Sequence, residues 1–260
     1  MNNQDNTGEL FTRLAVTGED LRAAQSLRYQ VFVEEMGGDG PLVDHAAKLE
    51  CDRFDDHAAH LLLCDPARPE GETVVGTYRL MTAEMAASAG QFYCEDEYDL
   101  TALRQSGLRL LELGRSCVHP DYRAGPGLKM MWSGLAAFVT ANDIDVAFGV
   151  ASFHGTDKEN LSHALSLLHH RHLAPPHLRV TAKGETAFDM AMCAPDAIDR
   201  VAAVRQIPAL IKGYLRLGGV VGQGAFVDHA FNTTDICLIL QRDALNVLQQ
   251  DLLAKGPRGG

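Results

Sequence analysis

The fold is decided by the stretch Leu108-Arg-Leu-Leu-Glu-Leu-Gly-Arg-Ser-Cys-Val118, which is followed by His119-Pro-Asp-Tyr-Arg-Ala-Gly-Pro-Gly127. Its apolar first part predicts a strand over residues 108–118, and the prolines and glycines that follow predict a turn. The next apolar segment predicts a helix over 127–141, and the β-branched run 144–152 suits a central strand. A strand, a helix and a second buried strand in this order predict an α/β sheet covered by helices.

The segments on either side continue the alternation of strands and helices. The patterns predict further strands over 11–16, 60–64, 73–81, 187–193, 225–228 and 236–240. They predict further helices over 19–35, 156–172 and 207–217, and a closing helix from Asp243. The chain contains no Pro/Gly/Ser-rich linker long enough to divide it. We therefore expect one α/β (or α+β) domain over 10–255, a disordered N-terminus over 1–9 and a flexible tail over 256–260.

Composition limits the classes of protein to which this chain can belong. Its 260 residues are 46% hydrophobic and 22% charged, which is ordinary for a globular protein with a sizeable core. The formal net charge of −11 disfavours nucleic-acid binding, which depends on a basic surface. No apolar run reaches the roughly 18 residues of a membrane span, and the polar N-terminus lacks the order of a signal peptide. We therefore expect a cytoplasmic protein.

Three charged residues lie inside apolar, strand-like runs. Arg79 lies in Val-Val-Gly-Thr-Tyr-Arg-Leu, while Glu112 and Arg115 lie in Leu-Leu-Glu-Leu-Gly-Arg-Ser. A charge in such a setting is costly unless it is paired, so we expect these groups to meet partners across the sheet. A structural ion-pair network explains all three residues well, and an active site is the alternative.

The densest group of polar residues is Glu50-Cys-Asp-Arg-Phe-Asp-Asp56, just before a predicted strand. Such a run is often only a solvated turn. In the functional interpretation, Asp52 and Asp55 face a cleft, where they bind an ammonium group or fix a neighbouring arginine.

Two other patterns bear on ligands. The glycines of Arg123-Ala-Gly-Pro-Gly127 open a predicted helix, where backbone N–H groups can approach a phosphate, although a plain turn has the same pattern. Five histidines crowd residues 163–177, but their cluster contains no acidic or cysteine ligand, so we expect no metal site. No serine or cysteine lies in a nucleophile motif, which disfavours a covalent enzyme intermediate.

Four motifs together resemble the signature of the acyl-homoserine-lactone synthases, which are GNAT-fold enzymes that use acyl-acyl-carrier-protein. In chain order they read Arg28-x-x-x-Phe32, Glu50-x-Asp52-x-Phe54-Asp55, Val74-Val-Gly-x-x-Arg79-Leu and Glu112-x-x-Arg115. Met36 and its glycine-rich surroundings replace an aromatic residue of that family.

Other segments are closer to a sister group, the ornithine N-acyltransferases of bacterial ornithine-lipid synthesis. They are Leu111-Glu-Leu-Gly-Arg-Ser-Cys-Val-His-Pro-Asp-Tyr-Arg123, Phe148-Gly-Val-Ala-Ser-Phe-His-Gly155, Leu210-Ile-Lys-Gly-Tyr-Leu-Arg-Leu-Gly218 and Asp228 with Phe231-Asn-Thr-Thr-Asp235. The resemblance covers residues 28–240, and its long C-terminal part makes it specific. It implies a GNAT-like central mixed sheet flanked by helices, with an extended C-terminal region.

The resemblance also implies an activity. A 3-hydroxyacyl chain passes from acyl carrier protein to the α-amine of ornithine, which gives a lyso-ornithine lipid. Relatives that use glutamine or another amino acid leave the acceptor open. No cofactor is bound in this interpretation, because the 4'-phosphopantetheine thioester of the carrier protein is a co-substrate.

The general base has two candidates. We expect Glu112 to take this role, because an apolar strand raises the pKa of a carboxyl group, and Asp52 is the competitor. Arg115 completes the predicted catalytic set.

The predicted substrate contacts follow the same motifs. Asp55 engages the side-chain ammonium of ornithine, and one of three arginines pairs with the substrate carboxylate. These arginines are Arg28, Arg79 and Arg115. Phe32 also belongs to the substrate-binding set. A backbone N–H near Ser116 to Val118 holds the oxyanion.

The carrier is expected to bind at the end of the strand and the loop after it. The residues concerned are Cys117, Val118, Arg123, Gly125 and Gly127. This loop is one residue shorter than the usual GNAT phosphate loop, Gln/Arg-x-x-Gly-x-Gly/Ala. A reduced loop suits the single phosphate of phosphopantetheine better than the diphosphate of coenzyme A.

Residues 200–227 contain no acidic residue but four basic ones, Arg200, Arg205, Lys212 and Arg216. This stretch is either a solvated helix edge or a docking surface, to which Lys212 and Arg216 are assigned. Its partner is then acidic acyl carrier protein, or the anionic inner membrane in peripheral contact.

Three functions therefore stay open. The first is an amino-acid N-acyltransferase of lipid synthesis. The second is an acyl-homoserine-lactone synthase, which needs S-adenosylmethionine and a pocket for adenosine. The third is a non-catalytic acyl-carrier binding module, in which Glu112 and Arg115 form only a structural pair. The C-terminal third of the chain disfavours the second function, and the charges on separate strands disfavour the third.

Overall fold

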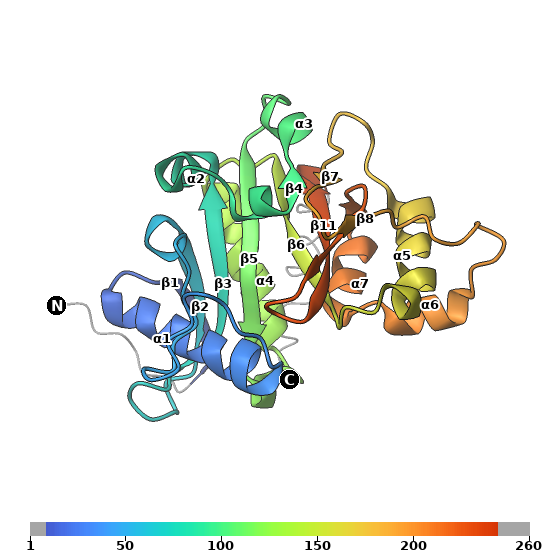
Figure 1. The fold of residues 1–260 in the computed structure, drawn as a ribbon. Helices are drawn as coiled ribbons and strands as arrows, with labels where there is room; N and C mark the ends of the chain where they lie inside the picture. Colours follow the sequence, from blue (N-terminus) through green and yellow to red (C-terminus); the bar gives the residue numbers. More distant parts are fainter. Residues whose placement is uncertain (1–8, 244–260) are drawn as a thin grey trace, which may run out of the picture.

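The strands predicted over 108–118 and 144–152 both form and lie at the centre of the sheet. β5 (Leu110–Val118) and β6 (Val146–His154) run in parallel, and α4 (Gly127–Ala141) connects them. The computed structural model describes residues 9–243. In these residues the main sheet has nine strands in the order β1-β2-β3-β5-β6-β11-β10-β8, with β9 paired to β11. This mixed sheet flanked by helices confirms the predicted α/β architecture (Figure 1).

The remaining elements surround this centre. The other strands are β1 (Phe11–Leu14), β2 (Ala59–Cys64), β3 (Val74–Thr82), β4 (Tyr98–Asp99), β7 (Thr181–Ala182), β8 (Ala187–Phe188), β9 (Val220–Val221), β10 (Ala225–Asp228) and β11 (Thr233–Gln241). β4 and β7 form a separate pair. The other helices are α1 (Gly18–Arg28), α2 (Ala83–Ala89), α3 (Thr101–Arg104), α5 (Lys158–His172), α6 (Arg200–Gln206) and α7 (Ala209–Arg216).

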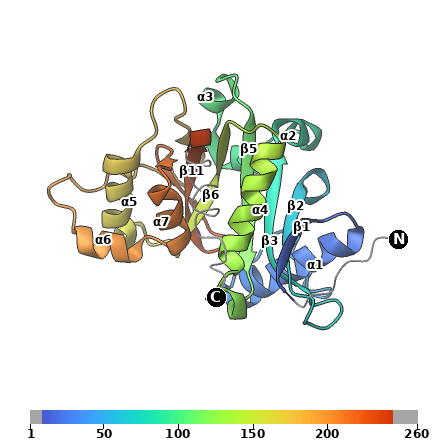
Figure 2. The ribbon, with the colours of Figure 1, turned by 180° about the vertical axis from the view of Figure 1, so that it is seen from behind.

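The described residues form three apolar cores, and the two largest lie on opposite faces of the sheet. α1 lies in front of the sheet in Figure 1, and α4 lies in front of it in the reverse view of Figure 2. Met131 and Leu135 of α4 are buried in the first core, which also takes residues from α5 and α7. Phe92 and Phe148 meet edge to face in the second core, with ring centroids 5.1 Å apart. The sheet is therefore covered on both faces around β5 and β6.

The helix predicted over 19–35 forms, but in two parts. Thr17 and Asp20 begin α1 with a capping box, in which each side chain accepts a hydrogen bond from the other residue's backbone N–H. After Arg28 the helix widens into a π-helical turn, Tyr29–Glu35. Such turns occur frequently at functional sites.

The prediction of a strand over 187–193 is wrong beyond the first two residues. β8 ends at Phe188, and the backbone after it pairs with a side chain of α5 instead of a strand. The Ser166 hydroxyl donates to the carbonyl oxygen of Met190 and accepts from the N–H groups of Met192 and Cys193, at 3.0, 3.0 and 2.9 Å. Periodicity could not reveal this competing partner.

Several short elements escaped prediction, namely α2, α3, α6, β4, β7 and β9, because each is too short to show a period. Residues 1–8 of the predicted disordered N-terminus, the closing helix after Asp243 and the tail 256–260 lie outside the described residues. The single domain over 10–255 stays a prediction. Within residues 9–243, the helices are all too short or too polar to span a bilayer.

Candidate active site

β5 and β6 separate halfway along their length. Their parallel pairing ends with Glu112 opposite Phe148. Gly149 follows at the branching point, where a Cβ would lie only 2.0 Å from the backbone oxygen of Leu113. Beyond this point, the edge of β5 that faces β6 has no strand partner among the described residues. Its backbone polar groups are therefore available to a ligand.

A β-bulge adds to this opening. The pairing of β3 with β5 shifts register between Thr77 and Arg79, so that two residues of β5, Arg115 and Ser116, stand opposite Tyr78. Arg115 has a φ of +49°, which is uncommon for a residue other than glycine. Backbone of this kind is often found at ligand sites.

The space between the strands is a cavity of about 630 Å³. Its aromatic and aliphatic lining includes Phe32, Tyr78, Tyr93, Leu113, Phe148, Leu210, Tyr214, Phe231, Leu238 and Leu240. Its polar lining includes Glu35, Arg115, Ser116, Arg123, Ser152, His154, Asp228, Thr233 and Asp235. The apolar residues include members of both larger cores, so the cavity reaches both faces of the sheet.

Beside the cavity lies a buried network of three arginines and three carboxylates, which we call the paired network. Its members are Arg28, Glu50, Asp52, Asp55, Arg79 and Arg115. Arg28 is fully buried and donates to both oxygens of Asp55, at 2.8 and 2.9 Å, and to a carboxylate oxygen of Glu50. Although burial opposes ionisation, Arg28 and Arg79 hold the pKa of Asp55 well below its usual value.

The other two arginines complete the network. Arg79 donates to Asp52 at 2.5 Å and to Asp55 at 3.0 Å. Arg115 lies 3.1 Å from both Glu50 and Asp52. Although burial opposes ionisation, Arg79 and Arg115 hold the pKa of Asp52 below its usual value. The formal charges of the six groups cancel, so the expected pairing across the sheet is present.

This network changes the interpretation of several predicted site residues. Arg28, Arg79, Asp52 and Asp55 are not among the residues that line the cavity, and their charged atoms are occupied by one another. Asp55 is therefore not placed to meet a substrate ammonium, and the low pKa of Asp52 makes it a poor base. Arg115 alone of the six lines the cavity, where its guanidinium stacks near Tyr93, 4.7 Å from the ring centroid.

Glu112 is also turned away from the cavity. Its two carboxylate oxygens accept the backbone N–H groups of Tyr93 and Cys94, at 2.8 and 2.6 Å. Burial raises its pKa, as the sequence predicts. However, it does not line the cavity, and the geometry gives it a structural role in holding the segment Tyr93–Asp96. The Glu112 and Arg115 side chains bind other partners and do not form the structural pair that the binding-module alternative assigns to them.

The other predicted residues, two from the substrate-binding set and seven from the acyl-carrier set, fall into two groups. Phe32, Ser116, Cys117, Val118 and Arg123 line the cavity, whereas Gly125, Gly127, Lys212 and Arg216 do not. Arg123 is held at the cavity by two hydrogen bonds to Glu35, both 2.6 Å, and by one to the Val118 carbonyl oxygen at 3.0 Å. Gly125 has a φ of +140° in the loop that opens α4. Burial raises the pKa of Cys117 to about 12, so its thiol stays protonated.

Sequence reasoning gave no role to three acidic residues at the other side of the cavity, which we call the carboxylate trio. Glu97, Asp228 and Asp235 bring carboxylate oxygens within 4.8 Å of one another. Asp228 and Asp235 line the cavity. Burial raises the pKa of Asp235 to about 6, and burial with the charges of Asp235 and Asp228 holds the pKa of Glu97 well above its usual value. Asp235 did carry a signal, because it begins the apolar run Ile-Cys-Leu-Ile-Leu.

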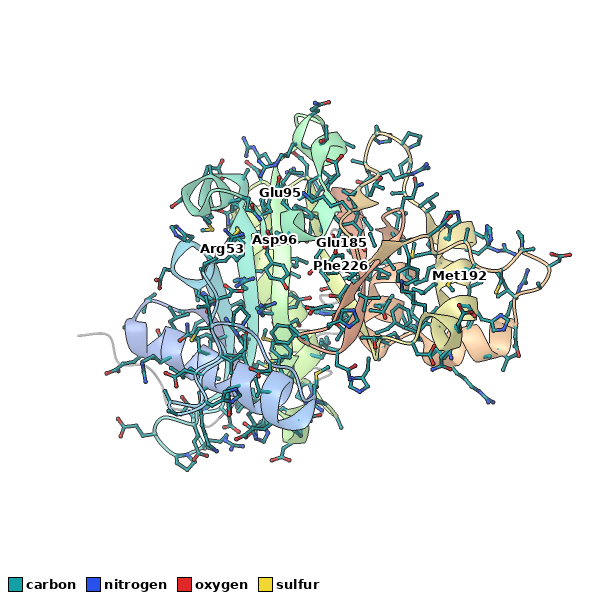
Figure 3. The ribbon with its side chains drawn as sticks, in the orientation of Figure 1. Arg53, Glu95, Asp96, Glu185, Met192 and Phe226 are labelled. Carbon is teal, nitrogen blue, oxygen red and sulfur yellow. The ribbon has the colours of Figure 1, made fainter. Side chains whose placement is uncertain are left out.

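The segment before Glu97 is tied to the rest of the site. Arg53 and Asp96, labelled in Figure 3, lie next to each other and form an ion pair at 3.2 Å. Glu95, also labelled there, pairs with Arg104 of α3. The bonds to Glu112 and the Glu95–Arg104 pair hold the segment that carries Tyr93 and Glu97 against the sheet, whereas the exposed Arg53–Asp96 pair contributes little.

Comparison of the sequence with known proteins finds a matching domain family and closely similar full-length relatives. An acetyltransferase (GNAT) domain matches residues 27–133. Over 249 residues, the chain is 51% identical to "L-ornithine N(alpha)-acyltransferase" of Rhodobacter capsulatus, a match that covers 95% of each protein.

Solved structures show the same architecture at low sequence identity. The acyl-homoserine-lactone synthase LasI matches with a TM-score of 0.53 and 16% identity, over 97% of this chain and 98% of that one. The CoA-dependent acyl-homoserine-lactone synthase BjaI, solved with SAM and isopentyl-CoA, matches with a TM-score of 0.52 and 15% identity, over 94% and 90%. These likenesses establish the fold, a GNAT-like mixed sheet, and nothing finer.

Proposed function

Because this chain belongs to the family of L-ornithine N(alpha)-acyltransferases, we propose that it transfers a 3-hydroxyacyl chain from acyl carrier protein to the α-amine of ornithine. The product is a lyso-ornithine lipid. The observation that carries the proposal is the cavity between β5 and β6, which joins an apolar side to a side with charges of both signs. A long acyl chain and an amino acid need these two environments in one site.

The acyl chain occupies the apolar side in this proposal. Tyr78, Tyr214, Leu238 and Leu240 line it, and all four belong to the core beneath α4 and α7. The hydroxyl groups of Tyr78 and Tyr214 form a hydrogen bond with each other, so neither requires a water molecule as its partner. The surface left to a ligand is accordingly mostly apolar, which suits a methylene chain.

The thioester arm runs along the open edge of β5. Its amide groups form hydrogen bonds with the part of the β5 backbone that lacks a strand partner, as the backbone of an added strand would. The thioester carbonyl then lies near Ser116, and the phosphate lies toward Arg123 and the start of α4, which has no side-chain cap.

Acyl carrier protein docks on α6 and α7. Arg200, Arg205 and Arg216 are exposed there, and α7 also sends Leu210 and Tyr214 into the cavity lining. An acidic partner on this surface would hold its acyl arm close to the opening. An anionic membrane is the competing partner. Val201 and Val204 on α6 are exposed and apolar, so a test must distinguish binding to a membrane from binding to the carrier protein.

On the acceptor side, Arg115 pairs with the α-carboxylate of ornithine, which brings the α-amine to the bulge at Ser116. The neutral amine attacks the thioester carbonyl, a C–N bond forms and the C–S bond breaks. The proton lost by nitrogen ends on the departing thiol. The α-amine of an amino acid is less basic than a lysine side chain, so a minor fraction is neutral near pH 8 and can attack without a dedicated base. Neither Glu112 nor Asp52 is needed for the step.

The test is a turnover assay with the full chain. We expect 3-hydroxyhexadecanoyl-acyl carrier protein and ornithine to give acyl-ornithine by mass spectrometry, while glutamine and S-adenosylmethionine give none. Docking of the carrier on basic residues predicts a rate that falls steeply with salt up to about 0.3 M. A salt-independent rate that rises on anionic vesicles would favour the membrane. No product from any amino acid would overturn the proposed function.

A further inference from the structure

We propose that the carboxylate trio, Glu97, Asp228 and Asp235, binds the side-chain ammonium of ornithine and thereby selects a diamino acid as acceptor. This inference rests on the proposed function and replaces the role that the sequence assigned to Asp55.

The trio comes from three separate parts of the fold. Glu97 directly precedes β4, Asp228 ends β10 and Asp235 lies in β11 opposite Ser152 of β6. One oxygen from each lies within 4.8 Å of the other two, which is the spacing of acceptors around one small cation. An ammonium group has three N–H donors, so each carboxylate can accept one.

Two of these carboxylates each have one buried oxygen without a hydrogen-bond partner, although Ser152 and Thr233 also hydrogen-bond to the Asp235 side chain. Glu97 is 4% exposed and Asp235 is 3% exposed. Oε2 of Glu97 and Oδ1 of Asp235 are buried and have no hydrogen-bond partner. Neither carboxylate forms an ion pair with a basic side chain of the described residues, and a buried carboxylate oxygen without a partner destabilises a fold. The arrangement therefore calls for a cation that enters with the substrate.

The position of the trio fits the charge pattern of ornithine. Asp228, Asp235 and Arg115 line the same cavity. The electrostatic influence of Arg115 reaches Glu97 and Asp235, where it opposes the rise of their pKa. When the α-carboxylate of ornithine pairs with Arg115, the side chain of ornithine can therefore extend toward the trio. Ornithine ends in an ammonium, whereas glutamine ends in a neutral amide.

The electrostatics favour an ammonium ligand in a second way. Burial is the first cause of the raised pKa of Glu97, followed by the charges of Asp235 and Asp228. Burial also raises the pKa of Asp235, where Ser152 and Thr233 oppose the rise and the charge of Asp228 adds to it. A cation among the three removes both costs when it binds. The affinity for ornithine should therefore exceed that for norvaline, which has the same carbon chain without the terminal amine. We expect a difference of roughly ten- to a hundredfold, the worth of a charged hydrogen-bonded contact.

The experiment compares ornithine and norvaline in the wild-type chain, Glu97→Gln, Asp235→Asn and the control Asp96→Asn. Asp96 is adjacent to Glu97 in sequence but exposed and paired with Arg53, outside the cavity. KM and kcat are measured with acyl carrier protein as donor, and ornithine binding is measured separately by calorimetry. Both trio variants should raise the KM for ornithine roughly ten- to a hundredfold, leave the KM for norvaline unchanged and weaken ornithine binding equally. Asp96→Asn should behave as the wild type.

The outcomes separate the two proposals. A wild-type chain that acylates ornithine and norvaline with equal kcat/KM would overturn the trio's role while the proposed function stands. A wild-type chain that acylates neither would overturn the proposed function, and calorimetry would still test the trio. Binding of Ca²⁺ that both trio variants abolish, with ornithine binding unchanged, would replace the ammonium site with a metal site.

Discussion

The paired network and the carboxylate trio are both buried groups of charges, yet they are built in opposite ways. In the paired network each carboxylate meets at least one arginine, and the six formal charges cancel. In the trio, three carboxylates face one another and two of their oxygens have no partner. The difference indicates that the first group holds the fold together, with only Arg115 also facing the cavity, whereas the second is completed only by a ligand.

The largest effect should come from breaking the paired network. Arg28→Ala removes one of the two arginine partners of Glu50 and of Asp55 while leaving both carboxylates buried. We expect a loss of about 3–5 kcal/mol in the free energy of unfolding, as for other broken buried pairs. Urea unfolding at pH 7.5 measures it. A loss below about 1 kcal/mol would mean that the network does not hold the fold.

Neutralising a residue of the trio should increase the free energy of unfolding instead of lowering it. The size of this increase should depend on pH. The folded pKa of Asp235, about 6, lies above the usual 3.8, so this group stabilises the fold below pH 4 relative to high pH, and that contribution is lost as pH rises through 6. The groups that act on it are Glu97, Asp228, Arg115, Ser152 and Thr233.

Asp235→Asn removes this dependence. Relative to the wild type, the variant should therefore gain stability between pH 4 and pH 7, by about 3 kcal/mol at most. Urea unfolding at several pH values gives the difference directly. A variant whose relative stability does not change over this range would show that Asp235 is not held with a raised pKa.

The smallest effect should come from Glu112, which separates a structural role from a catalytic one. Glu112→Gln keeps one acceptor for the N–H groups of Tyr93 and Cys94 and loses the other. We expect a loss of about 1–3 kcal/mol in stability, with kcat changed less than about threefold. Single-turnover rates below the melting temperature give the answer. A fall in kcat of about a hundredfold in a folded variant would restore Glu112 as the general base.

The sequence predicted the scaffold better than it predicted the acceptor site. Arg79 and Arg115 were expected to be buried and paired because each interrupts an apolar strand, and both meet carboxylates. Glu112 gave the same signal, but its partners are backbone N–H groups, which no side-chain pattern reveals. Asp52 and Asp55 were expected to fix an arginine or bind an ammonium, and they do the former.

The trio could not be found from sequence because its members are close only in the folded chain. Glu97 lies in a short segment without periodicity, and Asp228 ends a short strand. Their meeting depends on β11 lying between β6 and β10, a topology that local patterns do not determine. Only Asp235, at the head of an apolar run, carried a usable signal.

The most direct test of this account is the thermal unfolding of the wild-type chain and Asp235→Asn at pH 7.5, each with and without ornithine. We predict that the variant melts at a higher temperature without ornithine, and that ornithine raises the melting temperature of the wild type far more than that of the variant. A variant that melts lower than the wild type and responds to ornithine as strongly would contradict the account, because Asp235 would then belong to the fold and not to the substrate.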